Sequence, residues 1–322
     1  MPLLTVKAPA KINLHLKIGN LRPDGFHSLE SLFAAVDFGD ILHFEPCPPD
    51  GSLIIEMNAL PHTFDAGQNP QEALPAAKNI IFRAVSLFRE RSGFNMGLKI
   101  RLEKRIPLGG GLGGGSSDAA AALYALNSLA EGASVHGAAP LDADSLAELG
   151  AAVGSDVPFF LKKCGAAWVS GRGETVQPLK IPQGLWLVLV KPDFSSDTAA
   201  AYRLLDQHRM AADVSAASAL APPLNPQMAA DALAAMPPHE WPFANDFLPV
   251  FLADAAVGAA YQKILGQLRE QGAEFTSLSG AGSTCFGAFR DREKALSAYE
   301  ALQNQWNFVK FTFLLEITDR AG

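Results

Sequence analysis

The residues best suited to do chemistry stand in a glycine-rich run from Pro107 to Asp118, Pro-Leu-Gly-Gly-Gly-Leu-Gly-Gly-Gly-Ser-Ser-Asp. Six glycines in seven residues cost backbone entropy and present bare N–H groups. The alanine- and leucine-rich stretch Ser116–Leu129 is predicted to be a helix, whose start adds unpaired N–H groups and a positive dipole end. Such donors hold phosphate oxygens. The run therefore predicts a phosphate-binding loop, in which Ser116 and Ser117 add hydroxyl groups, and Ser117 is a candidate magnesium ligand.

The setting of this run separates it from other glycine-rich sequences. A flexible linker would not be bracketed by a strand, a proline and a helix. A Walker A loop ends in Gly-Lys, and the chain contains no such pair. Gly109, Gly111 and Gly114 match the dinucleotide-binding spacing, but any glycine run supplies that match, and the strand before it alternates with charges instead of being continuously apolar. The protein-kinase triplet Asp37-Phe38-Gly39 is interpreted as chance, because the catalytic His-Arg-Asp motif is absent.

Hydrophobic periodicity predicts the elements that must position this loop. Ile12, Leu14, Leu16 and Ile18 alternate with polar residues, which predicts a half-buried strand. A second strand is predicted from Leu98 to Ile106, with Lys99, Arg101 and Lys104 between its apolar residues and Pro107 as its stop. The remaining expectations are helices over 142–153, from 198 onward, over 246–270 and over 292–303, strands over 185–190, 275–278, 284–289 and 308–317, and a variable excursion over 207–242.

Composition narrows the function classes. The 322 residues are 48% hydrophobic and 18% charged, which indicates a globular chain. A net charge of −7 argues against a nucleic-acid partner. Three separated cysteines indicate neither a disulfide framework nor a zinc site, so the reducing cytosol is the simplest compartment. Met1–Asn13 has no apolar signal-peptide core, and the longest strongly apolar run, around Trp186–Val190, is too short to span a membrane.

Five motifs, which follow one another along the chain in the family's order, resemble those of the GHMP kinase superfamily, and within it the diphosphocytidyl-methylerythritol kinases. The glycine loop resembles their phosphate loop, Gly111-Leu-Gly-Gly-Gly-Ser-Ser-Asp118 being the version typical of that group. The other four are Ala8-Pro-Ala-Lys-Ile-Asn-Leu14, Arg22-Pro-Asp-Gly-Phe-His27, Gly154-Ser-Asp-Val-Pro-Phe159, and the pair Asn245-Asp-Phe247 with Leu278-Ser-Gly-Ala-Gly-Ser-Thr284. Two features depart from the family pattern: Ala281 stands where serine is common, and the 207–242 excursion looks longer than the family needs.

The resemblance implies roles for individual residues. Lys11 and Asp156 are the implied catalytic pair, Asp156 accepting or orienting the substrate hydroxyl proton and Lys11 keeping that carboxylate ionised. ATP and Mg²⁺ are implied. The implied nucleotide contacts are Pro107, Leu108, Gly109, Gly110, Gly111, Leu112, Gly113, Gly114, Gly115, Ser116, Ser117, Asn79 and Lys104. Taken alone, Lys11 and Lys104 would be solvated strand lysines, and Asp156 would be a turn or cap residue.

The implied substrate is a small molecule, a cytidine diphosphate linked to methylerythritol. Asn13 would contact its diphosphate or polyol, and His27 would read the cytosine edge because imidazole both donates and accepts. Phe26 and Tyr202 would sandwich the cytosine ring. For Tyr202 the alternative is a core position on a helix.

The implied fold is α+β, with two domains and the active site in the cleft between them. Residues 1–168 would form the ATP-binding domain and residues 169–322 the substrate-binding domain, in a monomer or weak homodimer. Alternatives that stay open are a GHMP kinase for homoserine, mevalonate or a sugar, and a non-catalytic nucleotide-binding regulator on the same fold. A dinucleotide-dependent dehydrogenase is disfavoured by the alternating strand before the loop.

Overall fold

The computed structural model describes residues 4–48, 50–65, 79–132, 138–211 and 221–315. The chain forms two compact units that are interleaved in sequence. The first unit comprises Met1–Ala10, Phe38–Pro107 and Gly113–Lys163, and the second comprises Lys11–Asp37, Leu108–Leu112 and Cys164–Gly322. The predicted functional domains 1–168 and 169–322 stay a prediction.

Two long strands, β1 (Leu4–Leu21) and β2 (His27–Pro46), pair with each other and contribute residues to both units. The strand predicted around Ile12 lies within β1. The expectation that it is half-buried is wrong, because every residue from Lys11 to Leu16 is buried. Polar side chains between the apolar ones, among them Asn13 and His15, therefore point into protein and need partners there.

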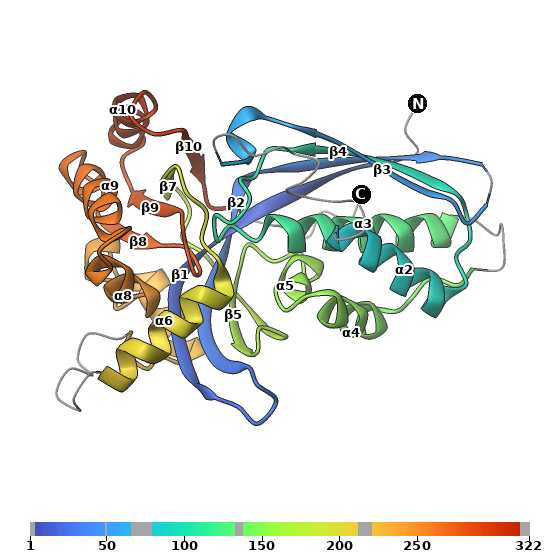
Figure 1. Cartoon of the computed structure of the whole chain (residues 1–322), viewed down its shortest axis with the longest axis horizontal. Helices are drawn as coiled ribbons and strands as arrows, with labels where there is room; N and C mark the ends of the chain where they lie inside the picture. Colours follow the sequence, from blue (N-terminus) through green and yellow to red (C-terminus); the bar gives the residue numbers. More distant parts are fainter. Residues whose placement is uncertain (1–3, 49, 66–78, 133–137, 212–220, 316–322) are drawn as a thin grey trace. The chain divides into compact units, whose positions relative to one another are not determined.

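The first unit packs its helices on one face of a sheet (Figure 1). β4 (Leu98–Lys104) pairs antiparallel with the Ile41–Pro46 half of β2 and parallel with β3 (Leu53–Ala59). The parallel pairing needs a crossover connection, which includes the 3-10 turn η1 (Pro61–Thr63) and the helix α2 (Ile80–Ser92). The other helices of this unit are α3 (Gly114–Gly132), α4 (Ala143–Val153) and α5 (Val157–Leu161).

The ends of α4 follow directly from sequence. Asp142 caps its start, since its carboxylate accepts the Ser145 N–H at 2.7 Å. Gly154 ends it, as predicted. Helix α3 starts at Gly114, two residues before the predicted start at Ser116, and ends at Gly132, so the last two glycines of the glycine-rich run are helical.

The second unit contains a four-stranded antiparallel sheet in the order β10–β7–β9–β8. Its strands are β7 (Trp186–Lys191), β8 (Phe275–Leu278), β9 (Cys285–Phe289) and β10 (Phe308–Phe313). α9 (Gly258–Glu270) and α10 (Arg292–Leu302) bury residues in one core with these strands (Figure 1). The predicted late order of helix, strand, strand, helix, strand is confirmed.

The same unit contains β5 (Ala166–Gly171), which joins the His27–Asp37 half of β2 to β6 (Thr175–Leu179). Its remaining elements are α6 (Thr198–Ala211), α7 (Pro226–Ala235), the turn η4 (Pro238–Glu240) and α8 (Phe247–Ala253). The 207–242 excursion thus holds the end of α6, all of α7 and η4, while its residues 212–220 lie outside the described residues.

One predicted helix is wrong. The stretch 246–270 is two helices, α8 and α9, bent by 117° at their junction. Asp254 causes the break, because its carboxylate accepts the N–H groups of Ala256 and Val257 and competes with the helical pattern.

Among the described residues, no single helix is long and apolar enough to cross a membrane. The bent pair α8–α9 meets the length and composition criteria only when the two helices are taken together.

Candidate active site

The glycine loop is held through its carbonyl groups. Gly109 O accepts the N–H groups of Ser196 at 3.0 Å and Ser283 at 3.2 Å, and Gly110 O accepts the Thr284 N–H at 3.1 Å. Gly111 O accepts the Ser279 hydroxyl at 2.8 Å. The carbonyl oxygens, which would repel an anion, are therefore engaged in hydrogen bonds within the protein, as a phosphate-binding loop requires.

Two features of the loop demand glycine. Gly109, Gly111 and Gly113 have φ angles of 60°, 72° and 69°, in the left-handed region that other residues avoid. A Cβ on Gly111 would lie 2.1 Å from the backbone oxygen of Ser279. The glycine loop thus packs against the sequence motif around Ser279. Gly111 and Ser279 both belong to the second unit.

A buried charged cluster supports the start of α3 in the first unit. Lys104 Nζ contacts carboxylate oxygens of Asp40 and, at 2.9 Å, of Asp118 in the first turns of α3. Asp40 Oδ1 also accepts the N–H groups of Arg105 at 2.5 Å and Ile106 at 2.8 Å. All three side chains are at most 4% exposed. The cluster ties the end of β4 to the helix that follows the loop.

Charge balance in this cluster follows from burial. One lysine cannot neutralise two carboxylates out of contact with water. Burial raises the pKa of Asp118 to about 8, with Lys104 opposing and the Asp40 carboxylate adding to the rise. The pKa of Lys104 is raised by the two carboxylates, which outweigh its desolvation. At neutral pH the cluster therefore holds Asp118 protonated beside the charged Lys104.

This cluster changes the interpretation of Lys104. The alternative of an exposed strand lysine is wrong, since Lys104 is in phase with the buried residues Leu98, Ile100 and Leu102 of β4. Its ammonium group contacts Asp40 and Asp118, and its contact with the adenine nucleotide stays a prediction.

Ser117, the candidate magnesium ligand, is 1% exposed, and its hydroxyl has no hydrogen-bond partner among the described residues. A buried hydroxyl without a partner costs free energy unless something completes it. An ion or a phosphate oxygen would do so. The parts of the chain that the structure describes contain no group of three or more His, Cys, Asp or Glu side chains that could hold a metal by themselves.

Lys11 lies at the centre of a buried polar chain in the second unit. Its Nζ donates to Asn13 Oδ1 at 2.7 Å and lies 4.2 Å from the centroid of the Phe33 ring. Asn13 Nδ2 donates to Ser31 Oγ at 2.9 Å. Lys11 is 4% exposed and Asn13 is 2% exposed. Asn13 thus orients the lysine, and this is the role that the geometry favours over direct contact with a diphosphate.

Strand β1 is hydrogen-bonded to the glycine loop and to the motif around Ser279. The Lys11 N–H donates to Leu112 O at 2.9 Å, and the Asn13 N–H lies 3.3 Å from Ser279 Oγ. Ser279 therefore joins the Ala8–Leu14 motif to the glycine loop in space. Lys11 and the loop carbonyls are held in one hydrogen-bonded assembly.

Asp156 and Asn79 lie in the first unit. Asp156 precedes α5 as its N-terminal flanking residue, is half-buried, and its side chain makes no capping hydrogen bond. Asn79 caps α2, with Oδ1 accepting the Ile81 N–H at 2.9 Å. Asp156 thus lies in a turn, which the structural alternative had allowed, and its catalytic role stays a prediction, while Asn79 has a clear structural role.

The predicted base-binding residues fall into two pairs. The His27 and Tyr202 rings stack, with centroids 5.1 Å apart and an angle of 27° between their planes. The Phe26 side chain is 54% exposed and carries the Arg172 guanidinium 5.2 Å from its ring centroid. Phe26 thus has the exposure that a stacking platform needs, and Arg172 is a neighbour that the sequence alone did not suggest.

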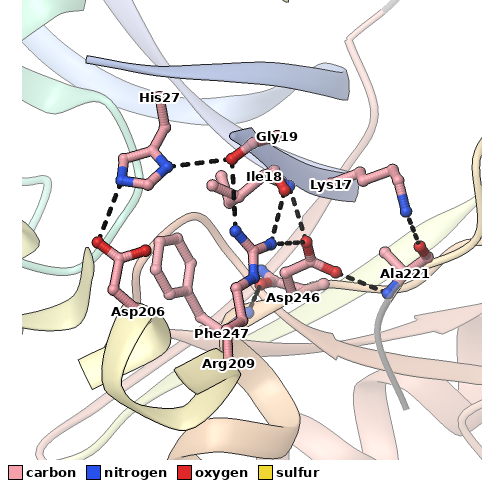
Figure 2. A network of polar contacts seen from close by, with 10 residues as sticks. Lys17, Ile18, Gly19, His27, Asp206, Arg209, Ala221, Asp246 and Phe247 are labelled. Carbon is pink, nitrogen blue, oxygen red and sulfur yellow. Dashed lines mark hydrogen bonds and ion pairs between the residues drawn. The ribbon is translucent and has the colours of Figure 1, made fainter. Parts of the chain in front are cut away.

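The Asn245–Phe247 motif has a structural explanation. Asn245 Nδ2 donates to the carbonyls of Leu278 and Gly280, so it shapes the turn that supports the glycine loop. Asp246 is 1% exposed and accepts the Ile18 N–H at 2.8 Å, the Ala221 N–H at 2.6 Å and Arg209 Nη2 at 3.1 Å (Figure 2).

Sequence reasoning missed several residues of this assembly. Ser31 and Arg209 carry no local signal, because what matters is a partner that is distant in sequence. Ser279 and Asp246 lay inside motifs that were recognised, and only their individual roles were missing.

Comparison with known proteins identifies the families that this chain matches. Residues 79–163 match the family described as GHMP kinases N terminal domain, and residues 244–307 match the family described as GHMP kinases C terminal. A 4-diphosphocytidyl-2-C-methyl-D-erythritol kinase of Treponema pallidum is 37% identical over 309 residues, covering 95% of this chain and 97% of that protein. The enzyme of the same name from Chloroherpeton thalassium is 36% identical over 307 residues, covering 94% and 95%.

Solved structures also match the fold of this chain. The crystal structure of a 4-(cytidine 5'-diphospho)-2C-methyl-D-erythritol kinase matches with a TM-score of 0.73 and 31% identity, covering 96% of this chain and 99% of that one. A homoserine kinase from Cytophaga hutchinsonii matches with a TM-score of 0.62 at 17% identity, covering 98% and 95%, and shows a shared fold only.

Proposed function

The chain belongs to the GHMP kinases, a two-domain α+β family of ATP-dependent enzymes, and from its relatives within that family we propose that it phosphorylates the 2-hydroxyl of 4-diphosphocytidyl-2-C-methyl-D-erythritol, in the non-mevalonate route to isoprenoid precursors. The observation that carries the kinase chemistry is the glycine loop, whose carbonyls are tied to the 279–284 turn and whose end starts α3. The N–H groups of that first helical turn are the donors for the ATP phosphates.

The transfer needs one bond formed and one broken. The substrate hydroxyl oxygen attacks the γ-phosphorus of ATP, the bond from that phosphorus to the β–γ bridging oxygen breaks, and ADP leaves. Asp156 takes or orients the hydroxyl proton. Lys11, held by Asn13, supplies positive charge where negative charge develops.

Magnesium fits this proposal through Ser117, whose buried hydroxyl has no partner among the described residues. When bound with ATP, Mg²⁺ supplies charge neutralisation on the phosphates. Asp40 and Asp118 are committed to Lys104, so they act by holding the start of α3.

We propose that Phe26 and Tyr202 sandwich the cytosine ring and that His27 reads its edge. The exposure of Phe26 and the contact of the His27 and Tyr202 rings support this proposal. Stacking on an aromatic side chain contributes about 1–3 kcal/mol per base. We also propose that the enzyme works in the cytosol as a monomer or weak homodimer, without nucleic-acid or membrane partners.

The test is an assay of ATP-dependent phosphorylation with the diphosphocytidyl substrate. Homoserine and mevalonate are tested separately as alternative substrates. We expect turnover of the first only. Asp156→Asn should lower kcat by about 10²–10⁴-fold, with ATP-analogue binding unchanged. Asp144→Asn, an exposed carboxylate in the first turn of α4, is the matched control and should keep full activity.

The other outcomes identify the alternatives. Turnover of homoserine or mevalonate would assign a different GHMP substrate. ATP binding without turnover of any alcohol would favour the non-catalytic regulator.

A further inference from the structure

Residues 194–196, called the clamp below, lie in the connection between β7 and α6 and contact the start of the glycine loop within the second unit (Figure 1). The Ser195 hydroxyl donates to Leu108 O at 3.0 Å, and the Ser196 N–H donates to Gly109 O at 3.0 Å. A Cβ on Gly109 would lie 2.6 Å from the Cβ of Ser195, so the clamp and the loop are in direct contact.

The clamp also binds the motif on which the glycine loop rests. The Ser196 hydroxyl donates to Ala281 O at 2.6 Å. The Ser283 hydroxyl donates to Phe194 O at 2.6 Å. Ser196 therefore uses its two donors in two directions, the N–H toward the glycine loop and the hydroxyl toward the 278–284 motif.

Regular structure holds the clamp at both ends. On one side Lys191, the last residue of β7, is 4% exposed, and its ammonium group donates to Phe194 O at 3.0 Å. On the other side Asp197 accepts the Ala200 N–H at 2.6 Å and so caps the first turn of α6. A segment this short, bonded at both ends, gives the loop a fixed support.

The clamp completes a row of engaged carbonyls along the glycine loop. Those of the next residues are already bonded to the 278–284 motif and to β1, and the clamp adds Leu108 and a second donor at Gly109. Because a peptide group is planar and trans, each carbonyl turned into the protein turns the N–H of the following residue to the opposite side. The positive φ angles of Gly109 and Gly111 help to gather such N–H groups into an anion-binding concavity.

We propose that Ser196, with Ser195 beside it, is a positioning residue for phosphoryl transfer, which fixes the start of the glycine loop so that the loop N–H groups meet the phosphates of ATP. Neither serine touches the nucleotide, and both act through the loop carbonyls. Without the hydroxyl groups, the Leu108 and Ala281 carbonyls lose donors and the loop can turn an oxygen toward the anion. The proposal rests on the proposed ATP site and extends it to a segment outside the loop.

The first measurement compares two ligands that differ in their phosphates. Ser196→Ala should weaken binding of a non-hydrolysable ATP analogue by about three- to tenfold, and the double variant Ser195→Ala/Ser196→Ala by about ten- to a hundredfold. Adenosine has no phosphate to meet the loop, so its affinity should not change. Ser196→Thr keeps the hydroxyl and should restore the affinity for the analogue. Ser297→Ala, at an exposed position on α10, is the matched control and should bind both ligands like the wild type.

The second measurement needs no ligand. Hydrogen exchange of the whole protein, read by mass spectrometry, reports the Ser283 and Thr284 N–H groups, which donate to Gly109 O and Gly110 O. When the clamp is weakened, these bonds should open more often, so exchange in this peptide should be about tenfold faster in the double variant than in the wild type. Ser297→Ala should exchange like the wild type. If the double variant does not fold, Ser196→Ala and Ser196→Thr give the same comparison.

The outcomes separate the clamp from the proposed function. An unchanged affinity for the ATP analogue in the alanine variants overturns the proposal. An equal loss for adenosine also overturns it, because that result would show a general loosening of the protein. A wild type that binds no nucleotide removes the proposed function instead, and the exchange rates then decide whether the clamp holds the loop.

Discussion

His15 should make the protein sensitive to mild acid. Its side chain in β1 is fully buried and stacks on Trp168, with ring centroids 5.9 Å apart. Nδ1 lies 3.3 Å from the Ala244 nitrogen and accepts its N–H, and Nε2 has no partner among the described residues. Burial, and secondarily the charge of Lys17, lowers the pKa of His15 from 6.5 to about 4.

The sign and size of the effect follow from linkage. Between about pH 6.5 and pH 4 the unfolded chain binds a proton at His15 that the folded chain does not bind, so the free energy of unfolding falls as the pH falls. At 1.36 kcal/mol per pKa unit, the full loss is about 3 kcal/mol. That is a large share of the 5–15 kcal/mol typical of a folded domain.

The assay is urea unfolding across this pH range for the wild type and His15→Asn. Asparagine keeps an oxygen that can accept the Ala244 N–H, and it does not titrate. The variant pays a cavity cost at neutral pH, but the gap should close by about 3 kcal/mol toward pH 4. His208→Asn, at an exposed position on α6, controls for loss of a histidine and should track the wild type. Parallel pH profiles for the wild type and His15→Asn would refute the reasoning.

Three further outcomes are expected. Gly111→Ala should abolish nucleotide binding because its Cβ meets backbone, whereas Gly184→Ala, at a similar φ of 74° with no atom within 4 Å, should cost only about 1 kcal/mol of stability and no activity, as measured by calorimetry and turnover. Lys104→Met should lower the free energy of unfolding by about 3–5 kcal/mol, because it leaves the buried Asp40 and Asp118 side chains without their cationic partner, and an unchanged urea midpoint would contradict this. The wild type should lose stability as the pH rises from about 4 to 8, because folded Asp118 keeps a proton that the unfolded chain releases. Asp118→Asn should not show this loss, and a loss of equal size in the variant would count against the reasoning.

Local signals predicted both ends of α4, whereas α2, which Asn79 caps just as locally, was not predicted. Asp142 and Gly154 bracket α4 because a carboxylate cap and a glycine act within one turn. The break after α8 was also local, in Asp254, but an apolar pattern running through it concealed the change of direction. The short helix after Asp156 was missed because five residues leave too little periodicity to detect.

The candidate site divides along the same line. The glycine loop, Lys11 and the 278–284 motif could be found from residue type, spacing and resemblance. The environment of Lys104 could not, because the carboxylates that bury it come from other segments of the chain. The contacts of Ser196 with Gly109 and Ala281 are likewise tertiary, with no trace in the local sequence. The roles given to these residues stay predictions until the variants are measured, as does the placement of the active site between the domains.

The interleaving of the two units has a consequence for synthesis on the ribosome. The second unit needs Lys11–Asp37 from the start of the chain, and Asn13 meets Ser279 only after 266 further residues. At about 5–20 residues per second, that delay is roughly 13–50 seconds. Throughout this time the apolar side chains of β1 that the finished second unit buries, Leu16 and Ile18, lack their native cover. We therefore expect the nascent chain to expose this apolar part of β1 for most of its synthesis.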